Sequence, residues 1–213
     1  MRNRSLLRAR ALILAPALLT LVACSARAPA QMVADKSDAL RADMRKLWED
    51  HVTWTRLYIV SAAANLPDKE ANAARLMRNQ DDIGNAIKPY YGDAAGTQLT
   101  GLLKSHITIA TEIIDAAMKG DNAGKEDAAR RWGANADDIA GLLSGANPTN
   151  WPLPEMKRML HDHLDLTTQE VVAHLGKDWA GSIAAYDRIH EQVLAMADAL
   201  SAGIAKQFPD KVM

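Results

Sequence analysis

Apolar side chains recur at alternating intervals of three and four residues through most of this chain, and this spacing restricts its fold more than any other feature. The pattern stops at short segments that contain Gly or Pro. Aromatic residues make up 5% of the chain and runs of β-branched residues are few, which also favours helices over a sheet. We predict six helices, over residues 38–64, 68–90, 94–119, 123–145, 154–175 and 179–207.

An internal repeat runs through the predicted helices. The segments around His51, His106 and His163 share one pattern, with these histidines 55 and 57 residues apart. A second motif begins at Asn79 and recurs 56 residues later at Asn135. Because the connections are short, successive helices should lie antiparallel. We therefore predict an all-α fold, an up-and-down six-helix bundle built from three repeated helical hairpins. Chance similarity among amphipathic helices is the alternative.

The N-terminus has the pattern of an export signal. Four arginines precede an apolar run over residues 11–23 that is too short to span a bilayer. Leu-Val-Ala then precedes Cys24, which resembles the lipobox of bacterial lipoproteins, where the cysteine becomes the acylated first residue. We expect a signal peptide over residues 1–23, a lipidated cysteine and tether over 24–36, and one helical domain over 37–213. An ordinary secretory signal is the alternative.

These features predict a location and exclude several classes of partner. We expect an exported protein of the cell envelope, anchored by lipid to the outer membrane and facing the periplasm if the cell is Gram-negative. Loss of residues 1–23 removes four arginines and no acid, so the formal net charge changes from −1 to −5. No basic block remains, so nucleic acid is not an expected partner, whereas a protein partner stays open. Cys24 is the sole cysteine, which excludes an internal disulfide or a Cys-based metal site.

Five of the six histidines fall on predicted inward faces, and His161 points outward. We hypothesise that His51, His106 and His163 converge on a transition metal, copper or zinc, or on a polar ligand. Imidazole suits both metals, and two methionines near His163 favour copper because thioethers are soft ligands.

An acid opposite each of these histidines could fix one ring nitrogen and free the other for a ligand. Antiparallel hairpins place three acids at the heights of His51, His106 and His163, respectively Asp82, Asp138 and Glu191. The remaining supporting residues lie in the third hairpin: Glu170, His174 and His190. The alternative is that each histidine makes one interhelical hydrogen bond and only specifies packing. Asn79 and Asn135 are interpreted as hydrogen-bonded core amides.

The sequence predicts a binding role rather than an enzymatic one. It contains no Gly-x-Ser-x-Gly, His-Glu-x-x-His or Glu-x-x-His motif and no Gly-rich phosphate loop, so we predict no catalytic residue. We expect a cell-envelope lipoprotein that holds a transition metal or small ligand through buried histidines. The alternative is a structural or partner-binding envelope protein in which the histidines have no ligand.

Three stretches resemble a family of uncharacterised bacterial exported, lipoprotein-like, all-helical proteins: LWEDHVTWTRLYIVSAAANLP, NADDIA and MADALSAGIAKQFPD. The resemblance covers about residues 40–210. Some members carry inherited enzyme names such as glycosyltransferase, and no motif in this sequence supports that chemistry. The resemblance implies one helical domain and transfers no catalytic residue.

Overall fold

A computed structural model describes residues 29–212 of the chain, with side chains from residue 36 onward. The predicted signal peptide and Cys24 lie outside the described residues. Between residues 29 and 212 the regular structure is entirely helical, which confirms the all-α prediction. The elements are α1 (Pro29–Ala63), α2 (Lys69–Lys119), α3 (Asn122–Ala146), α4 (Leu153–Leu175), α5 (Trp179–Gln207) and the short 3-10 helix η1 (Pro209–Lys211).

Five α-helices are present in this part of the chain rather than the six expected, because α2 spans two of the predicted helices. Gly92 is the non-helical residue inside α2, with φ 85° and ψ 167°. This conformation is open to glycine and strained for other residues, so the chain turns sharply there without a separate loop. Gly84 and Gly96 allow the two arms of α2 to approach closely, since a Cβ on either would lie 2.6 Å from the other's carbonyl oxygen.

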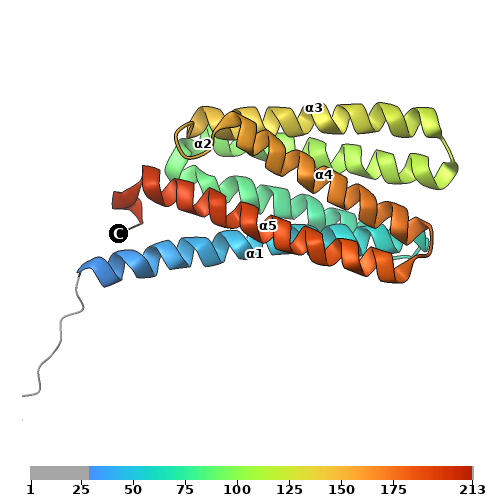
Figure 1. Cartoon of the computed structure of the whole chain (residues 1–213), viewed down its shortest axis with the longest axis horizontal. Coiled ribbons are helices and arrows are strands. Elements are labelled where there is room, and N and C mark those ends of the chain that lie inside the picture. Colours follow the sequence, from blue (N-terminus) through green and yellow to red (C-terminus); the bar gives the residue numbers. More distant parts are fainter. Residues whose placement is uncertain (1–28, 213) are drawn as a thin grey trace, which may run out of the picture.

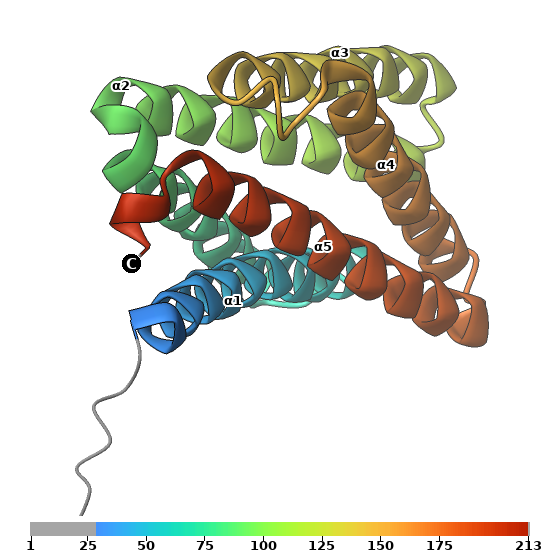
Figure 2. The ribbon, with the colours of Figure 1, turned by 60° about the vertical axis from the view of Figure 1, so that its left-hand side comes forward.

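The helices form a closed ring in which each contacts its neighbours in the chain and α5 returns to α1 (Figure 1). The first arm of α2 lies along α1 and the second arm lies along α3, while α4 crosses from α3 toward α5 (Figure 2). On the α1–α5 contact, Arg41 and Arg45 both donate to the carboxylate of Asp198 at 2.7 and 2.8 Å. These hydrogen bonds hold the pKa of Asp198 far below its ordinary range.

The connections alternate between the two ends of the bundle (Figure 1). The α1–α2, α2–α3 and α4–α5 connections lie at one end. The bend of α2, the α3–α4 connection, the start of α1 and the C-terminus lie at the other. We call the first the distal end, because it lies away from the start of α1.

The apolar core consists of two clusters. The larger extends from Met44 on α1 to Ile204 on α5 and contains Trp151, which is 1% exposed although it follows a loop. Gly203 makes room for this indole, since a Cβ there would meet Trp151 Nε1 at 2.1 Å. The smaller cluster comprises Tyr58, Ile59, Ala62, Ile114 and Val171.

Helix α1 begins earlier than the sequence indicated. It starts at Pro29 rather than near residue 38, so the last part of the expected tether is helical. No helix within residues 29–212 is long and apolar enough to span a membrane.

Candidate functional site

Three buried histidines, here called the histidine row, come from three different helices. His51 lies on α1, His106 on the second arm of α2 and His163 on α4, and they are 3%, 4% and 5% exposed. The rings of His51 and His163 have their centroids 5.7 Å apart. This burial confirms that all three face the interior.

His106 and His163 each contact a side-chain amide oxygen on the following helix. His106 Nδ1 lies 2.8 Å from Asn135 Oδ1. His163 Nδ1 lies 3.2 Å from Gln192 Oε1. Because an amide oxygen only accepts hydrogen bonds, both imidazoles carry their proton on Nδ1 and a lone pair on Nε2.

A second hydrogen bond fixes the orientation of each amide. Asn135 Nδ2 donates to the Leu102 carbonyl at 3.1 Å. Gln192 Nε2 donates to the Met159 carbonyl at 2.9 Å. Each carbonyl belongs to the residue four positions before the histidine. Since the amide nitrogen is held by the backbone, the amide oxygen is left facing the ring.

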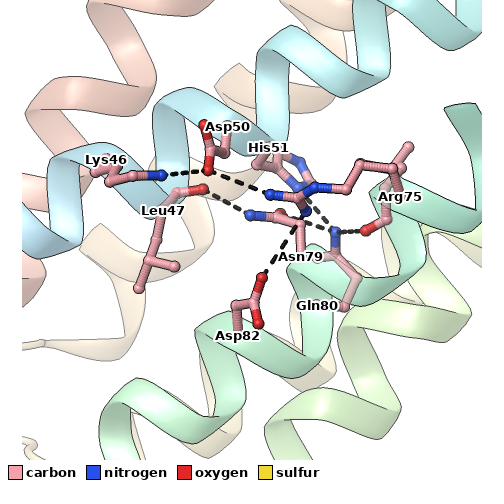
Figure 3. Close-up of polar contacts among 9 residues, drawn as sticks. Lys46, Leu47, Asp50, His51, Arg75, Asn79, Gln80 and Asp82 are labelled. Atoms are coloured by element: carbon pink, nitrogen blue, oxygen red, sulfur yellow. Dashed lines mark hydrogen bonds and ion pairs between the residues drawn. The ribbon is translucent and has the colours of Figure 1, made fainter.

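At His51, two consecutive residues divide the contacts with the ring and with the carbonyl four residues before it (Figure 3). Asn79 Nδ2 donates to the Leu47 carbonyl at 2.9 Å, again four residues before the histidine. Gln80 Nε2 lies 3.3 Å from His51 Nδ1 and donates to the Leu76 carbonyl at 2.8 Å. Gln80 Nε2 also donates to Asn79 Oδ1 at 3.1 Å, so both of its hydrogens have closer acceptors than His51 Nδ1. The interpretation of Asn79 and Asn135 as core amides is confirmed.

The acids expected opposite the histidine row lie elsewhere, and buried amides take their place. Asp82, Asp138 and Glu191 are exposed. The Asp82 carboxylate lies 3.8 Å from Arg75 Nη1. Each helical residue turns by about 100°, so Asp82, two positions after Gln80, points to the opposite side of α2.

Glu170 forms a buried ion pair between α4 and α1. It is 2% exposed, and Arg56 Nη1 donates to its Oε1. Burial raises the pKa of Glu170, whereas Arg56 acts in the opposite direction. The Arg56 guanidinium also lies 5.0 Å from the centroid of the Tyr186 ring. The structure therefore pairs this carboxylate with a guanidinium rather than with the histidine row.

The two remaining supporting histidines are half-buried and contact neighbours of their own. His174 Nδ1 lies 3.3 Å from Ser182 Oγ, between α4 and α5. His190 Nε2 lies 3.0 Å from Glu49 Oε1, between α5 and α1. His161 is exposed as predicted.

Burial lowers the pKa of every histidine in the row because the charged form loses its hydration. It brings the pKa of His106 to about 3 and that of His163 to about 4. The pKa of His51 falls well below its ordinary value for the same reason, and the two neighbouring histidines lower it further. All three rings are therefore neutral near pH 7.

Polar atoms without hydrogen-bond partners in the described structure gather beside the histidine row. Trp48 Nε1, Gln80 Oε1 and Trp132 Nε1 are buried and unpartnered. The Trp48 ring lies 5.7 Å from that of His51, and the Trp132 ring lies 5.0 Å from that of His106. Such atoms commonly mark internal water. Among the described side chains, no group of three or more His, Cys, Asp and Glu residues is arranged to hold a metal ion.

An apolar cavity of about 280 Å³ lies beyond the histidine row toward the distal end, between α1, α2, α3 and α4. Its walls include the residues four and eight positions after each histidine, namely Thr55, Ile59, Ala110, Ile114, Thr167 and Val171. A helix rises 1.5 Å per residue, so these positions lie about 6 and 12 Å along the helices from the histidine row. The cavity separates the main core cluster from the smaller one.

The cavity wall is apolar even where threonines line it. Thr55 Oγ1 donates to the His51 carbonyl and Thr167 Oγ1 to the His163 carbonyl, both at 2.8 Å. These hydroxyls are satisfied within their own helices. Trp132 also lines the cavity, and its ring lies 5.0 Å from that of His106, tilted by 36°. The indole therefore joins the cavity to the histidine row.

The mouth of the cavity lies between α3 and α4. The exposed residues of its lining come from these two helices: Glu126, Ala129, Thr168 and Val172. Val172 is 65% exposed, although it is apolar. A small apolar molecule could therefore enter from solvent without passing the histidine row.

The burial of the histidine row was predicted from the sequence, whereas the cavity beside it was not. A weak signal existed in the repeat, because Ala110 stands four residues after His106 where the other two helices carry threonine. Three alanines line the cavity where larger residues would have filled it: Ala110, Ala117 and Ala129.

Comparison with known proteins gave no match to any family model, curated protein or solved structure.

Proposed function

We propose that this chain is a binding protein of the cell envelope, whose helical bundle holds a small apolar molecule in the cavity between α1, α2, α3 and α4. One observation carries the proposal: a cavity of about 280 Å³, with a wall of apolar groups and a mouth to solvent, lies within the apolar core. A 150 Å³ cavity lined by aliphatic and aromatic side chains admits benzene in another protein. This cavity therefore has room for a molecule about twice that size.

Titration of the mature chain carrying Cys24→Ser with N-phenyl-1-naphthylamine tests the proposal, because this neutral probe fluoresces in apolar surroundings. We expect saturable binding of one probe per chain. Ala110→Phe places an aromatic ring in the cavity and should weaken binding at least tenfold.

Ala94→Phe is the matched control, because Ala94 is exposed on the same helix and does not line the cavity. It should leave the affinity unchanged. Equal effects of the two substitutions, or unsaturable binding to the wild type, would contradict the proposal.

The envelope location belongs to the same proposal and is supported by the N-terminal sequence. The arginines, the apolar run and the residues before Cys24 support export followed by acylation of Cys24. Cells fed an alkyne-bearing fatty acid should label the wild-type chain and not Cys24→Ser. A label retained by the variant would show that acylation occurs elsewhere.

We further propose that the bundle comprises three copies of one helical hairpin, six helical segments in all. The support is the repeated arrangement described above. At His106 and His163 one amide on the second segment contacts the histidine and the carbonyl four residues before it, and at His51 two consecutive amide residues share these contacts. The imidazole and the amide that contacts it are 29 residues apart in each case. Leu substitutions at the three histidines should have similar effects on stability if the copies are equivalent.

A second candidate function is metal binding by the histidine row. It is favoured by the fixed Nδ1–H tautomers of His106 and His163, which leave an Nε2 lone pair on each, as in metal sites whose histidines are oriented by an outer hydrogen bond. Elemental analysis of protein purified without a His tag should then find copper or zinc near one per chain, and His106→Ala should lose it. Substoichiometric metal in both proteins would exclude this candidate.

A further inference from the structure

The mouth of the cavity carries charge that the apolar wall does not explain. Two ionisable side chains line the cavity, Lys125 and Glu126, and both lie in the first turns of α3. Glu126 is exposed, whereas Lys125 is half-buried at the edge of the cavity. A lysine in this position can lay its methylene stem along the apolar wall and keep its ammonium at the mouth.

The ammonium of Lys125 is weakly engaged. It donates to the neutral amide oxygen of Asn122 at 3.4 Å, near the upper limit for a hydrogen bond. A neighbouring cation on the same helix has carboxylate partners, since Arg131 pairs with Glu112 and Asp127. Lys125 therefore keeps hydrogen-bonding capacity for an anion at the mouth.

The backbone at the start of α3 also favours an anion at the mouth of the cavity. The positive end of the α3 dipole lies beside the mouth, because Lys125 and Glu126 follow shortly after the start of the helix at Asn122. Asp121 caps the helix by accepting a hydrogen bond from Gly124 N at 2.9 Å. The cap uses one backbone N–H, and the ammonium of Lys125 stays available to contact an anion.

We infer that the ligand is a single-chain anionic amphiphile, with its hydrocarbon chain in the cavity and its acidic head group beside Lys125. This inference rests on the proposed function and names the chemistry of the molecule bound. Because benzene fits a 150 Å³ cavity, about 280 Å³ suits a chain of roughly ten carbons. A carboxylate or phosphate head would remain at the mouth, where water still solvates it.

Three probes with one chain length test the inference: decanoate, decanol and decyltrimethylammonium. Displacement of N-phenyl-1-naphthylamine from the mature chain carrying Cys24→Ser gives the affinity of each. Decanoate should bind about fivefold more tightly than the cationic probe. Lys125→Gln should weaken decanoate about fivefold and leave decanol unchanged, whereas Lys125→Arg should retain decanoate.

Glu126→Gln is the matched control, because it alters the adjacent charge on the same turn. It should leave decanoate binding unchanged or strengthen it. The inference is overturned if Lys125→Gln affects decanoate and decanol equally, or if the cationic probe binds best and loses affinity in Glu126→Gln. Failure of decanol itself to bind the wild type would overturn the proposed function instead, which separates the two failures.

Discussion

At the scale of single residues, a buried imidazole requires a neighbour that matches its tautomer. Asn135 meets this need because its nitrogen is held by the Leu102 carbonyl and its oxygen is left for His106. A carboxylate in the same place would bring a buried charge, whose desolvation is far more costly than that of an amide. This difference explains why amides, and not the acids expected from the sequence, face the histidine row.

Asn135→Ala should destabilise the bundle by about 2–4 kcal/mol, because it leaves both the His106 Nδ1–H and the Leu102 carbonyl buried without a partner. Urea denaturation followed by circular dichroism measures the change. Asn85→Ala, at an exposed position of α2, is the control and should change stability by less than about 0.5 kcal/mol. Similar values for the two variants would show that the amide is not needed.

The histidine row also predicts a dependence of stability on pH. The pKa of each ring is lower in the folded protein than in the unfolded chain, so unfolding takes up protons below about pH 6.5. Stability should be complete above that pH and fall as the pH decreases toward the folded pKa values of about 4 for His163 and about 3 for His106. Well below pH 6.5 the slope should approach 4 kcal/mol per pH unit for three rings.

His106→Gln should remove about one third of this slope, as measured by urea midpoints between pH 7 and pH 4.5. The lowered pKa of Asp198 stabilises the fold above about pH 4, and this contribution is lost only in more acidic solution. An unchanged slope in His106→Gln would mean that other groups cause the acid sensitivity.

At the scale of helices, the sharp turn inside α2 depends on one residue. Gly92→Ala should destabilise the fold by about 1–3 kcal/mol, since its φ of 85° is strained for alanine although open space surrounds it. Gly101→Ala, at a helical position of the same element with open space for a Cβ, should stabilise by about 0.5–1 kcal/mol. Thermal or urea unfolding of the two variants measures the change in stability. Changes of the same sign in both would refute this account of the bend.

The helical spacing of apolar residues was enough to predict where the chain is helical and that the three histidines are buried. The positions of the turns also predicted, to within a few residues, which part of the facing helix lies opposite each histidine. They could not give the facing side chain, because an error of two residues turns a helix by about 200°. The α2 bend was read as a break between helices, since spacing alone does not show that hydrogen bonding resumes directly after Gly92. The cavity was not predicted because it depends on how α1, α2, α3 and α4 fit together, and its lining residues range from Thr55 to Leu175.

At the scale of the whole molecule, the start of α1 and the cavity lie toward opposite ends of the bundle, and the expected lipid anchor is five residues before that start in the sequence. About 26 helical residues separate Pro29 from Thr55, which corresponds to about 40 Å. A fluorophore on Ala39→Cys of the acylated protein in vesicles should be quenched by doxyl-labelled lipid more than one on Met118→Cys at the distal end. Iodide in solution should show the reverse order.

Both labelled positions are exposed, and Cys24 would be blocked by its acyl group, so each variant carries one reactive thiol. Equal quenching by the lipid at the two positions would show that the bundle lies flat on the bilayer.

The separation between the start of α1 and the mouth beside α3 has a consequence for supply. In a lipid-anchored protein of this shape, the ligand would enter the cavity from the aqueous compartment or from another protein in that compartment. It would not enter by lateral diffusion from the membrane leaflet that holds the anchor. Such an arrangement suits transfer of the ligand from another protein rather than its extraction from the membrane.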